Sequence, residues 1–277
     1  MEQFVNVPIG DVRDYWNRRP CNVRHSQAEV GTKEYFDQVE ARKYMVEPHI
    51  PAFADFARWK GKKVLEIGCG IGTDTINFTR AGASVTAVDL SSESLSLAKK
   101  RAEVFGFSDK IKFYEANAER LNDFVPAEQF DLVYSFGVIH HSPHPEAIIS
   151  QIRDNFSATG TTLKLMVYYR YSWKVLWMLL QEKGRFWRLD DIIAKHSEAQ
   201  TGCPVTYSYS KETVKDLIGD GFEVNNSFVE HIFPYQIAKY VKYEYEKEWY
   251  WKMLPESVFH GMEKRFGWHL CVTARAK

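Results

Sequence analysis

The sequence predicts an α/β fold in which helices flank a seven-stranded, mostly parallel β-sheet and helical insertions form a cap. Short, continuous apolar runs alternate with segments of helical periodicity, as is typical of buried parallel strands joined by helices. Three alternating glycines follow the first of these runs. With 277 residues and 45% hydrophobic content, the chain is long and apolar enough to bury a full core.

The composition limits the partners. Lys and Arg together number 36, as do Asp and Glu, so no overall field favours nucleic acid or an acidic membrane. The four cysteines form no CxxC pair, which argues against a zinc site or a disulfide framework and fits a reducing cytoplasm. The chain start lacks a basic segment followed by an apolar core, and residues 161–180 contain three cations, so we expect neither a signal peptide nor a transmembrane segment.

The glycine turn is the first candidate ligand site. The apolar run 64–67 predicts a strand, Gly68, Gly70 and Gly72 follow it, and residues 74–80 read as a helix. Glycines at a strand end let the backbone turn tightly and approach a ligand. A dinucleotide fingerprint needs glycine at its sixth position, where this chain has Thr73, so the spacing departs from that of NAD-binding folds.

This stretch resembles the first motif of the class I S-adenosylmethionine-dependent methyltransferases, including an acidic residue, Glu66, two positions before the first glycine. The resemblance implies a Rossmann-like fold, S-adenosylmethionine as the cofactor, its methionyl end at the glycine turn, and Glu66 orienting that end or its water. A glycine-rich turn without a ligand is the alternative for the motif taken alone.

Two further strands supply cofactor candidates. Residues 83–90 predict a second strand ending in Asp89 and Leu90, and a carboxylate there can accept hydrogen bonds from both ribose hydroxyls. A role as a mere strand-end turn residue is the alternative for Asp89. Residues 111–115 predict a third strand, after which the family places the adenine beside the positions of Asn117, Ala118 and Glu119.

A histidine-rich loop follows the fourth expected strand, residues 130–136. Residues 137–146 resemble the fourth motif of the small-molecule branch, which implies that His140 and His141 contact the methyl acceptor and that Ser135 and Phe136 form the pocket floor. Either histidine is a candidate general base, because imidazole titrates near neutral pH. Structural histidines are the alternative. The loop's histidines and Glu146 also invite a metal hypothesis, but no metal is expected, because no matching ligands are evident elsewhere.

The remaining elements give the domain division. Residues 161–169, 221–224 and 268–274 predict the last three strands, and a helix is expected over 211–218. We expect an N-terminal helical lid over 1–60, a cofactor-binding half over 61–169, a cap insertion over 170–209, and a C-terminal half over 210–277 with a second insertion at about 234–267.

The candidate acceptor-binding residues are aromatic or basic. Aromatic faces can attract a sulfonium through cation–π contacts, and cations can bind a carboxylate or phosphate. Packing of the aromatic residues and solvated surface charges are the alternatives. The candidates are Tyr15, Trp16, Arg24, His25, Tyr35, His140, Lys164 and Tyr168.

These features together predict a methyltransferase that acts on an oxygen or nitrogen of a small organic acceptor, in specialised-metabolite biosynthesis. Aromatic insertions suit such an acceptor, whereas the zero net charge disfavours nucleic acid. The alternatives are an RNA or protein methyltransferase, a non-catalytic cofactor-binding module, and an NAD-dependent oxidoreductase. A Trp-rich insertion lying on a membrane is a further alternative to core packing.

Overall fold

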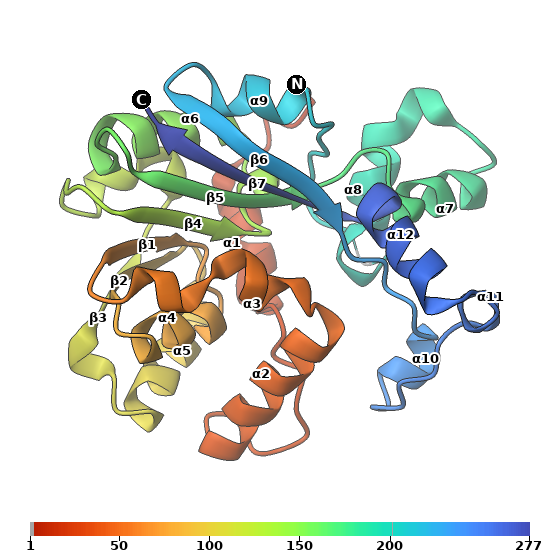
Figure 1. Ribbon diagram of the computed structural model, residues 1–277, viewed down its shortest axis with the longest axis horizontal. Helices are drawn as coiled ribbons and strands as arrows, with labels where there is room; N and C mark the ends of the chain where they lie inside the picture. The colour runs from red at the N-terminus through yellow and green to blue at the C-terminus, as the bar shows by residue number, and fades with distance from the viewer. Residues whose placement is uncertain (1–2, 201) are drawn as a thin grey trace.

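The computed structural model describes residues 3–200 and 202–277 and is built on one seven-stranded sheet (Figure 1). The strand order is β3-β2-β1-β4-β5-β7-β6. The strands are β1 (Lys63–Ile67), β2 (Ser84–Asp89), β3 (Ile111–Glu115), β4 (Leu132–Phe136), β5 (Thr162–Tyr168), β6 (Phe222–Glu230) and β7 (His269–Ala276). The predicted fold class is therefore confirmed.

The strand directions place the ends of several strands along one edge of the sheet. Strands β3, β2, β1, β4 and β5 pair in parallel, whereas β7 runs antiparallel to both β5 and β6. The carboxyl ends of the five parallel strands and of β6 therefore meet the amino end of β7, where Tyr168 pairs with His269 and Glu230 pairs with the same histidine. Open parallel sheets bind ligands at this edge.

Each face of the sheet carries its own apolar core, because successive strand side chains point to opposite faces. On one face, Leu65 of β1 and Val133 of β4 pack in a cluster that includes Ile148. On the other face, Val64 and Tyr134 pack with residues of the surrounding helices.

Helices connect the strands and cover both faces. Side-chain caps start several of them: Thr32 accepts from the backbone of Tyr35, and Ser91 accepts from that of Ser94. The helices are α1 (Ile9–Arg18), α2 (Lys33–Val46), α3 (His49–Ala54), α4 (Thr73–Arg80), α5 (Ser92–Val104), α6 (Pro145–Gln151), α7 (Trp173–Gln181), α8 (Leu189–Gln200), α9 (Thr213–Ile218), α10 (Ile237–Tyr240), α11 (Trp249–Lys252) and α12 (Glu256–Phe266).

The sixth strand is longer than the sequence predicts. It runs over Phe222–Glu230 rather than 221–224, with a bulge between Val224 and Asn226. It is an edge strand held by backbone pairing with β7, so several of its side chains are polar and partly exposed. The strand therefore contains no continuous apolar run from which its full length could be predicted.

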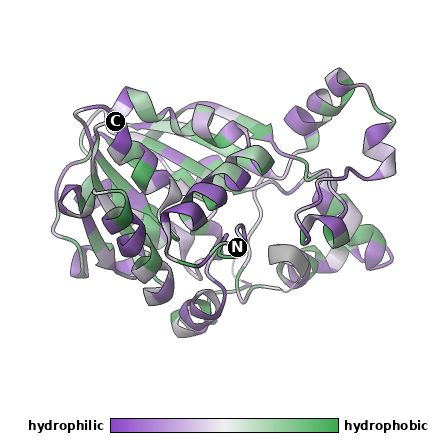
Figure 2. Ribbon diagram, turned by 90° about the horizontal axis from the view of Figure 1, so that it is seen from below, coloured by the Kyte–Doolittle hydropathy of each residue, from purple (hydrophilic) through white to green (hydrophobic). Residues whose placement is uncertain are grey.

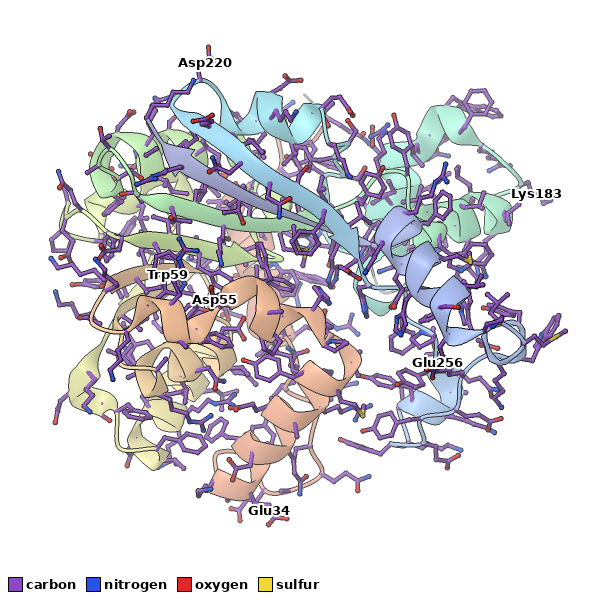
Figure 3. The ribbon with its side chains drawn as sticks, in the orientation of Figure 1. Glu34, Asp55, Trp59, Lys183, Asp220 and Glu256 are labelled. Atoms are coloured by element: carbon purple, nitrogen blue, oxygen red, sulfur yellow. The ribbon has the colours of Figure 1, made fainter. Side chains whose placement is uncertain are left out.

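Both insertions project from the same end of the sheet (Figures 1 and 2). The first carries α7 and α8, and the second carries α10, α11 and α12. Figure 3 labels Lys183 in the first and Glu256 in the second. Within the described ranges, no helix is long and apolar enough to cross a bilayer.

Candidate active site

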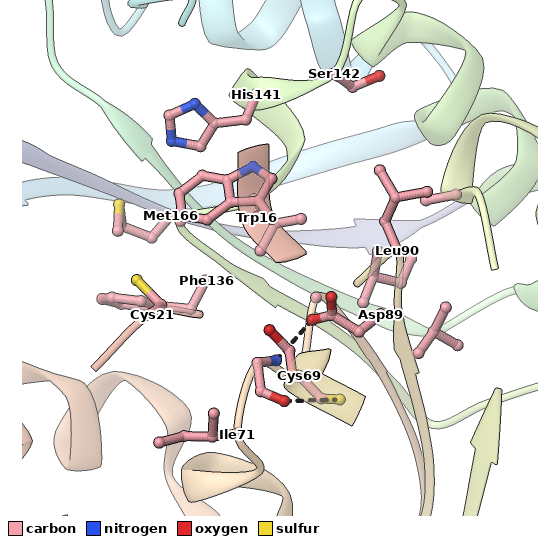
Figure 4. A pocket seen from close by; sticks show the side chains of 18 of the residues that line it. Trp16, Cys21, Cys69, Ile71, Asp89, Leu90, Phe136, His141, Ser142 and Met166 are labelled. Carbon is pink, nitrogen blue, oxygen red and sulfur yellow. Dashed lines mark hydrogen bonds between the residues drawn. The ribbon is translucent and has the colours of Figure 1, made fainter. Parts of the chain in front are cut away.

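A cavity of about 290 Å³ lies at the carboxyl edge of the sheet, between the strand ends and the N-terminal helices (Figure 4). Its size is near the lower limit for small-molecule sites. The residues that line it include Ile9, Trp16, Cys21, Lys43, Glu47, Gly68, Gly70, Asp89, Leu90, Asn117, Ala118, Phe136, His141, Met166, Tyr168 and His269.

The glycine turn forms one wall of this cavity. A Cβ atom on Gly68 would lie 2.1 Å from Cγ2 of Val138, and the backbone there has φ +78°, so only glycine fits. At Gly70 (φ +54°), a Cβ atom would meet nothing within 4 Å. The backbone at Gly70 is thus open to a ligand. Gly72 does not line the cavity; it packs against Ala98 of α5 and precedes α4.

The carboxylate of Asp89 is held at the edge of the cavity by backbone amides. Gly70 N donates to Oδ2 at 2.7 Å, as drawn in Figure 4, and Ser91 N donates to Oδ1 at 2.8 Å. Burial raises the pKa of Asp89 to about 6, against the opposing effect of these amides, so the carboxylate is mostly ionised at neutral pH. Each oxygen retains a lone pair for a ligand hydroxyl. An open glycine backbone next to an oriented carboxylate fits the ribose and methionyl parts of S-adenosylmethionine.

Glu66 lies beneath the turn and does not line the cavity, so its predicted role of orienting the methionyl end or its water stays a prediction that it could meet only through the turn. It shares the sheet face of Val64 and accepts a hydrogen bond from the Thr75 hydroxyl at 2.5 Å. Burial, followed by repulsion from Asp74, raises the pKa of Glu66 to about 8. Its carboxyl group therefore holds the start of α4 in place.

Two residues predicted at the adenine and floor positions serve local structure instead. Ser135 donates to the carbonyl of Ile67 at 3.0 Å between two strands. Glu119 accepts from the hydroxyl of Ser142 and, at 3.1 Å, from the amide of His144. Neither Ser135 nor Glu119 lines the cavity, which corrects both predictions.

Asn117 lines the cavity, but its side chain is already engaged. Its Oδ1 accepts from the amide of Glu119 at 3.0 Å and so caps a short helical turn. Ala118, Leu90 and Phe136 also line the cavity, as the sequence predicts.

The two adjacent histidines have different environments. His141 lines the cavity, and its Nδ1 lies 2.8 Å from the carbonyl oxygen of Val205. His140 is fully buried outside the cavity lining, with its ring 3.9 Å from that of Tyr168. Burial lowers the pKa of His140 well below its usual value. The prediction that His140 contacts the acceptor is therefore corrected, whereas His141 stays a candidate.

The aromatic candidates divide in the same way. Trp16 lines the cavity and places its ring 5.2 Å from that of His141, edge to face. Tyr168 lines the cavity as well and stacks on Trp268 at 4.1 Å. Tyr15 is buried outside the cavity lining, where its ring meets that of Trp16, which corrects its predicted contact with the acceptor.

Tyr35 and Lys164 are held inside the protein. The Tyr35 hydroxyl donates to the carbonyl of Val23 at 2.8 Å, so this side chain anchors the N-terminal segment. The Lys164 ammonium donates to the carbonyl of Phe53 at 2.6 Å, at the end of α3. Neither residue lines the cavity, and both predictions are corrected.

Arg24 and His25 contact the second insertion instead of the cavity. The hydroxyl of Tyr243 donates to the carbonyl of Arg24 at 2.9 Å, and the hydroxyl of Tyr240 lies 3.3 Å from Nε2 of His25. These two residues therefore join the N-terminal segment to the C-terminal insertion, which corrects their predicted role in acceptor binding.

Sequence reasoning missed several lining residues. Lys43 and Glu47 come from α2 and its end, Met166 comes from β5, and His269 begins β7, where it pairs with Tyr168. Histidine at the start of the expected seventh strand was a usable signal. This histidine could be assigned to the site only if the strand was known to run antiparallel, because its amino end then lies at the carboxyl edge of the parallel strands.

A family described as a methyltransferase domain matches residues 59–218, more than half of the 277 residues. The chain belongs to this methyltransferase family. The match confirms the predicted superfamily and, with it, S-adenosylmethionine as the cofactor.

Individual relatives extend the comparison with this methyltransferase family. The chain is 38% identical over 99 residues to a ubiquinone biosynthesis O-methyltransferase of Actinobacillus pleuropneumoniae, a match that spans 34% of this chain and 40% of the relative's length. The magnesium protoporphyrin IX methyltransferase of Synechocystis is similar in structure, with a TM-score of 0.61, 17% identity, and coverage of 98% of this chain and 100% of that chain. The geranyl diphosphate C-methyltransferase of Streptomyces coelicolor has a TM-score of 0.61 at 14% identity, covering 97% of each chain. At these identities the two structures show the shared fold.

Proposed function

We propose that the protein transfers a methyl group from S-adenosylmethionine to an oxygen or nitrogen of a small organic acceptor. The observation that carries this proposal is a single cavity with two kinds of wall. Asp89 and the open backbone of Gly70 line one part of it, and His141 with Trp16 and Tyr168 lines another. The relative named as an O-methyltransferase of ubiquinone biosynthesis supports an oxygen acceptor.

The cofactor, when bound, supplies a methyl group activated by a positively charged sulfur. The chain's own contribution is orientation: Asp89 accepts hydrogen bonds from the ribose, and Gly70 leaves room for the methionyl part. Bringing two reactants together in the right geometry supplies much of the catalysis in such a displacement.

His141 is the proposed general base. The carbonyl of Val205 lies 2.8 Å from Nδ1, so the neutral ring carries its proton on Nδ1 and has its basic lone pair on Nε2. The Trp16 ring packs against the imidazole and fixes its plane. A base positioned in this way takes the acceptor's proton as the methyl group arrives, and such catalysis contributes about a hundred- to ten-thousand-fold.

Apolar side chains keep water from the reacting atoms. Phe136, Met166 and Val138 line the cavity with Trp16, so an acceptor beside the methyl group would meet a largely apolar wall. An apolar, aromatic wall of this kind supports a small organic molecule of the kind made in specialised metabolism over RNA, whose phosphates would need cations.

The test is a panel of phenols, hydroxy acids and amines assayed for release of S-adenosylhomocysteine. With an active acceptor, His141→Ala is expected to lower kcat about a hundred- to ten-thousand-fold while the affinity for S-adenosylhomocysteine stays within about twofold. His144→Ala is the matched control, because His144 lies on the same loop with a side chain that is 43% exposed. Equal rates for His141→Ala and wild type would remove His141 as the base. Cofactor binding without turnover of any acceptor would favour the non-catalytic alternative.

A further inference from the structure

Three potential metal ligands converge beside the cavity. Glu47 directly follows α2, His231 directly follows β6, and His269 begins β7. One ligand atom from each side chain lies within 4.8 Å of the other two, and no other three such side chains among the described residues come as close together. Glu47 and His269 also line the cavity.

The spacing of two of these atoms suits a shared ion. Nε2 of His269 lies 3.6 Å from Oε1 of Glu47. Ligand atoms bonded to one tetrahedral ion at about 2.1 Å are about 3.4 Å apart, so this pair needs almost no movement. The third ligand atom, on His231, needs only a small side-chain rotation, because it already lies within 4.8 Å of both.

A third histidine, His49, orients His269. Nε2 of His49 lies 3.0 Å from Nδ1 of His269, which places the hydrogen bond on Nδ1 and leaves Nε2 of His269 facing Glu47. Histidines that bind metals almost always use their second nitrogen in this way. The His49 ring also stacks on that of His231, with centroids 5.8 Å apart, so it supports both imidazoles.

The backbone at His231 is held in an uncommon conformation. Its φ is +75°, in the left-handed region that side chains rarely adopt, and its carbonyl accepts from Trp268 N at 2.7 Å. Strain of this kind persists where the surroundings over-determine it, and it gathers at functional sites. Here it fixes the point at which His231 leaves the sheet toward His269.

The charges around the group are mixed. Burial is the main cause that lowers the pKa of His231 to about 3 and that of His49 to about 4. Lys174 adds to the effect on His231, and Lys43 adds to that on His49. The positive charges of both lysines would repel a bound cation, whereas the negative charge of Glu47 would attract it.

We propose that Glu47, His231 and His269 bind one divalent transition-metal ion, for which Zn²⁺ is the favoured occupant. Two imidazoles and one carboxylate form a ligand set that leaves a position open for a further ligand. Because Glu47 and His269 line the cavity, that position would be open to it and, on the basis of the proposed function, would receive an oxygen of the acceptor. This proposal departs from the expectation of no metal, which rested on the lack of matching ligands elsewhere in the sequence; the structure brings these three together from distant segments.

The experiment is a titration of chelator-treated, dialysed protein with Co²⁺, followed by visible absorption and calorimetry, and repeated with Zn²⁺. We expect one equivalent of each ion to bind, with weakening of at least tenfold in Glu47→Gln and in His231→Ala. His260→Ala is the matched control, because His260 is an exposed histidine on α12 whose Nδ1 lies 2.8 Å from a carboxylate oxygen of Glu263. It is expected to leave metal affinity unchanged.

S-adenosylhomocysteine binding reports whether each variant is folded and separates the two proposals. Metal binding that is absent, or equal in wild type, Glu47→Gln and His231→Ala, overturns the metal site even if the cofactor product binds normally. Metal binding without binding of the cofactor product overturns only the proposed methyl transfer. If both ligand variants fail to fold, His49→Gln replaces them, and an affinity drop of about 10- to 100-fold is expected from loss of its support. An unchanged affinity in that variant contradicts the proposal.

Discussion

Nζ of Lys43 lies 2.8 Å from Oδ1 of Asp74, and this ion pair joins helix α2 to the first turn of the helix that follows the glycine turn. Two hydroxyls complete the network: those of Tyr44 and Tyr134 donate to the same carboxylate at 2.9 and 3.0 Å. Burial alone would lower the pKa of Lys43, but Asp74 holds it above its usual value. The N-terminal segment is thus fastened to the cofactor side of the cavity by a buried charge.

Asp74→Ala is expected to destabilise the protein by roughly 3 to 5 kcal/mol, because it leaves the Lys43 cation buried without its main partner. The pair's side chains are only 12% and 2% exposed. Urea unfolding measures the effect. Asp37→Ala is the control: its pair with Lys33 on the same helix is 67% and 46% exposed, so the expected loss is about 0 to 1 kcal/mol. Similar losses in the two variants would contradict a structural role for the buried pair.

Cofactor affinity should depend on pH through Asp89, whose pKa is raised to about 6 by burial. If the ionised carboxylate is the form that accepts the ribose hydroxyls, affinity is full above pH 6 and falls as pH drops through 6, by at most about tenfold per pH unit. Calorimetry with S-adenosylhomocysteine from pH 5 to 8 measures this fall. Asp89→Asn should bind more weakly and lose the dependence. An identical pH profile in that variant would show that another group titrates.

Arg42 closes the joint between the N-terminal segment and the second insertion. Its guanidinium lies 4.1 Å from the ring centroids of both Tyr240 and Tyr243, and Nη2 donates to the carbonyl of Tyr240 at 2.6 Å. Because buried cation–π contacts are worth about 2 kcal/mol, Arg42→Ala should loosen residues 234–267. Hydrogen exchange and limited proteolysis are the measurements, and Arg265→Ala, which removes an exposed contact with Phe266, is the control. Unchanged protection of residues 234–267 from hydrogen exchange and proteolysis would contradict a role for Arg42 in holding the insertion.

The strand pattern could be predicted because buried parallel strands are short apolar runs, and the glycine turn could be predicted because only glycine tolerates its conformation. The depth of a side chain within the sheet was harder to infer. Lys164 shares a sheet face with Tyr168 but lies four residues earlier on β5, about 13 Å from the carboxyl edge, so it cannot reach the cavity. Period-two alternation gives the face of a strand residue but not its fit to a ligand.

Long-range contacts account for what the sequence did not reveal. His25 lies 215 residues from Tyr240, and His49 lies 220 residues from His269, yet each pair is in contact. No local pattern encodes such pairings, because they depend on where the second insertion returns to the sheet and on the direction of β7. The proximity of His49, His231 and His269 therefore could not be predicted without the order of β7 and β6 in the sheet.

Glu66 predicts that the stability of the protein falls as pH rises, whereas cofactor affinity through Asp89 is expected to increase with pH. Its carboxyl ionises near its ordinary value of 4.5 in the unfolded chain but near 8 in the folded protein, since burial and Asp74 disfavour the charge. The folded state therefore binds the proton more tightly, and wild type loses stability relative to Glu66→Gln as pH rises from about 4.5 to 8, by at most about 1.4 kcal/mol per pH unit. Above pH 8 the difference levels off. Glutamine keeps an oxygen that accepts from Thr75 but cannot ionise, so Glu66→Gln should be the more stable protein at pH 9.

Unfolding free energies of both proteins at pH 5, 7 and 9 test this, with the exposed Glu115→Gln as the control. A difference that does not grow with pH would mean that Glu66 is already ionised in the native protein.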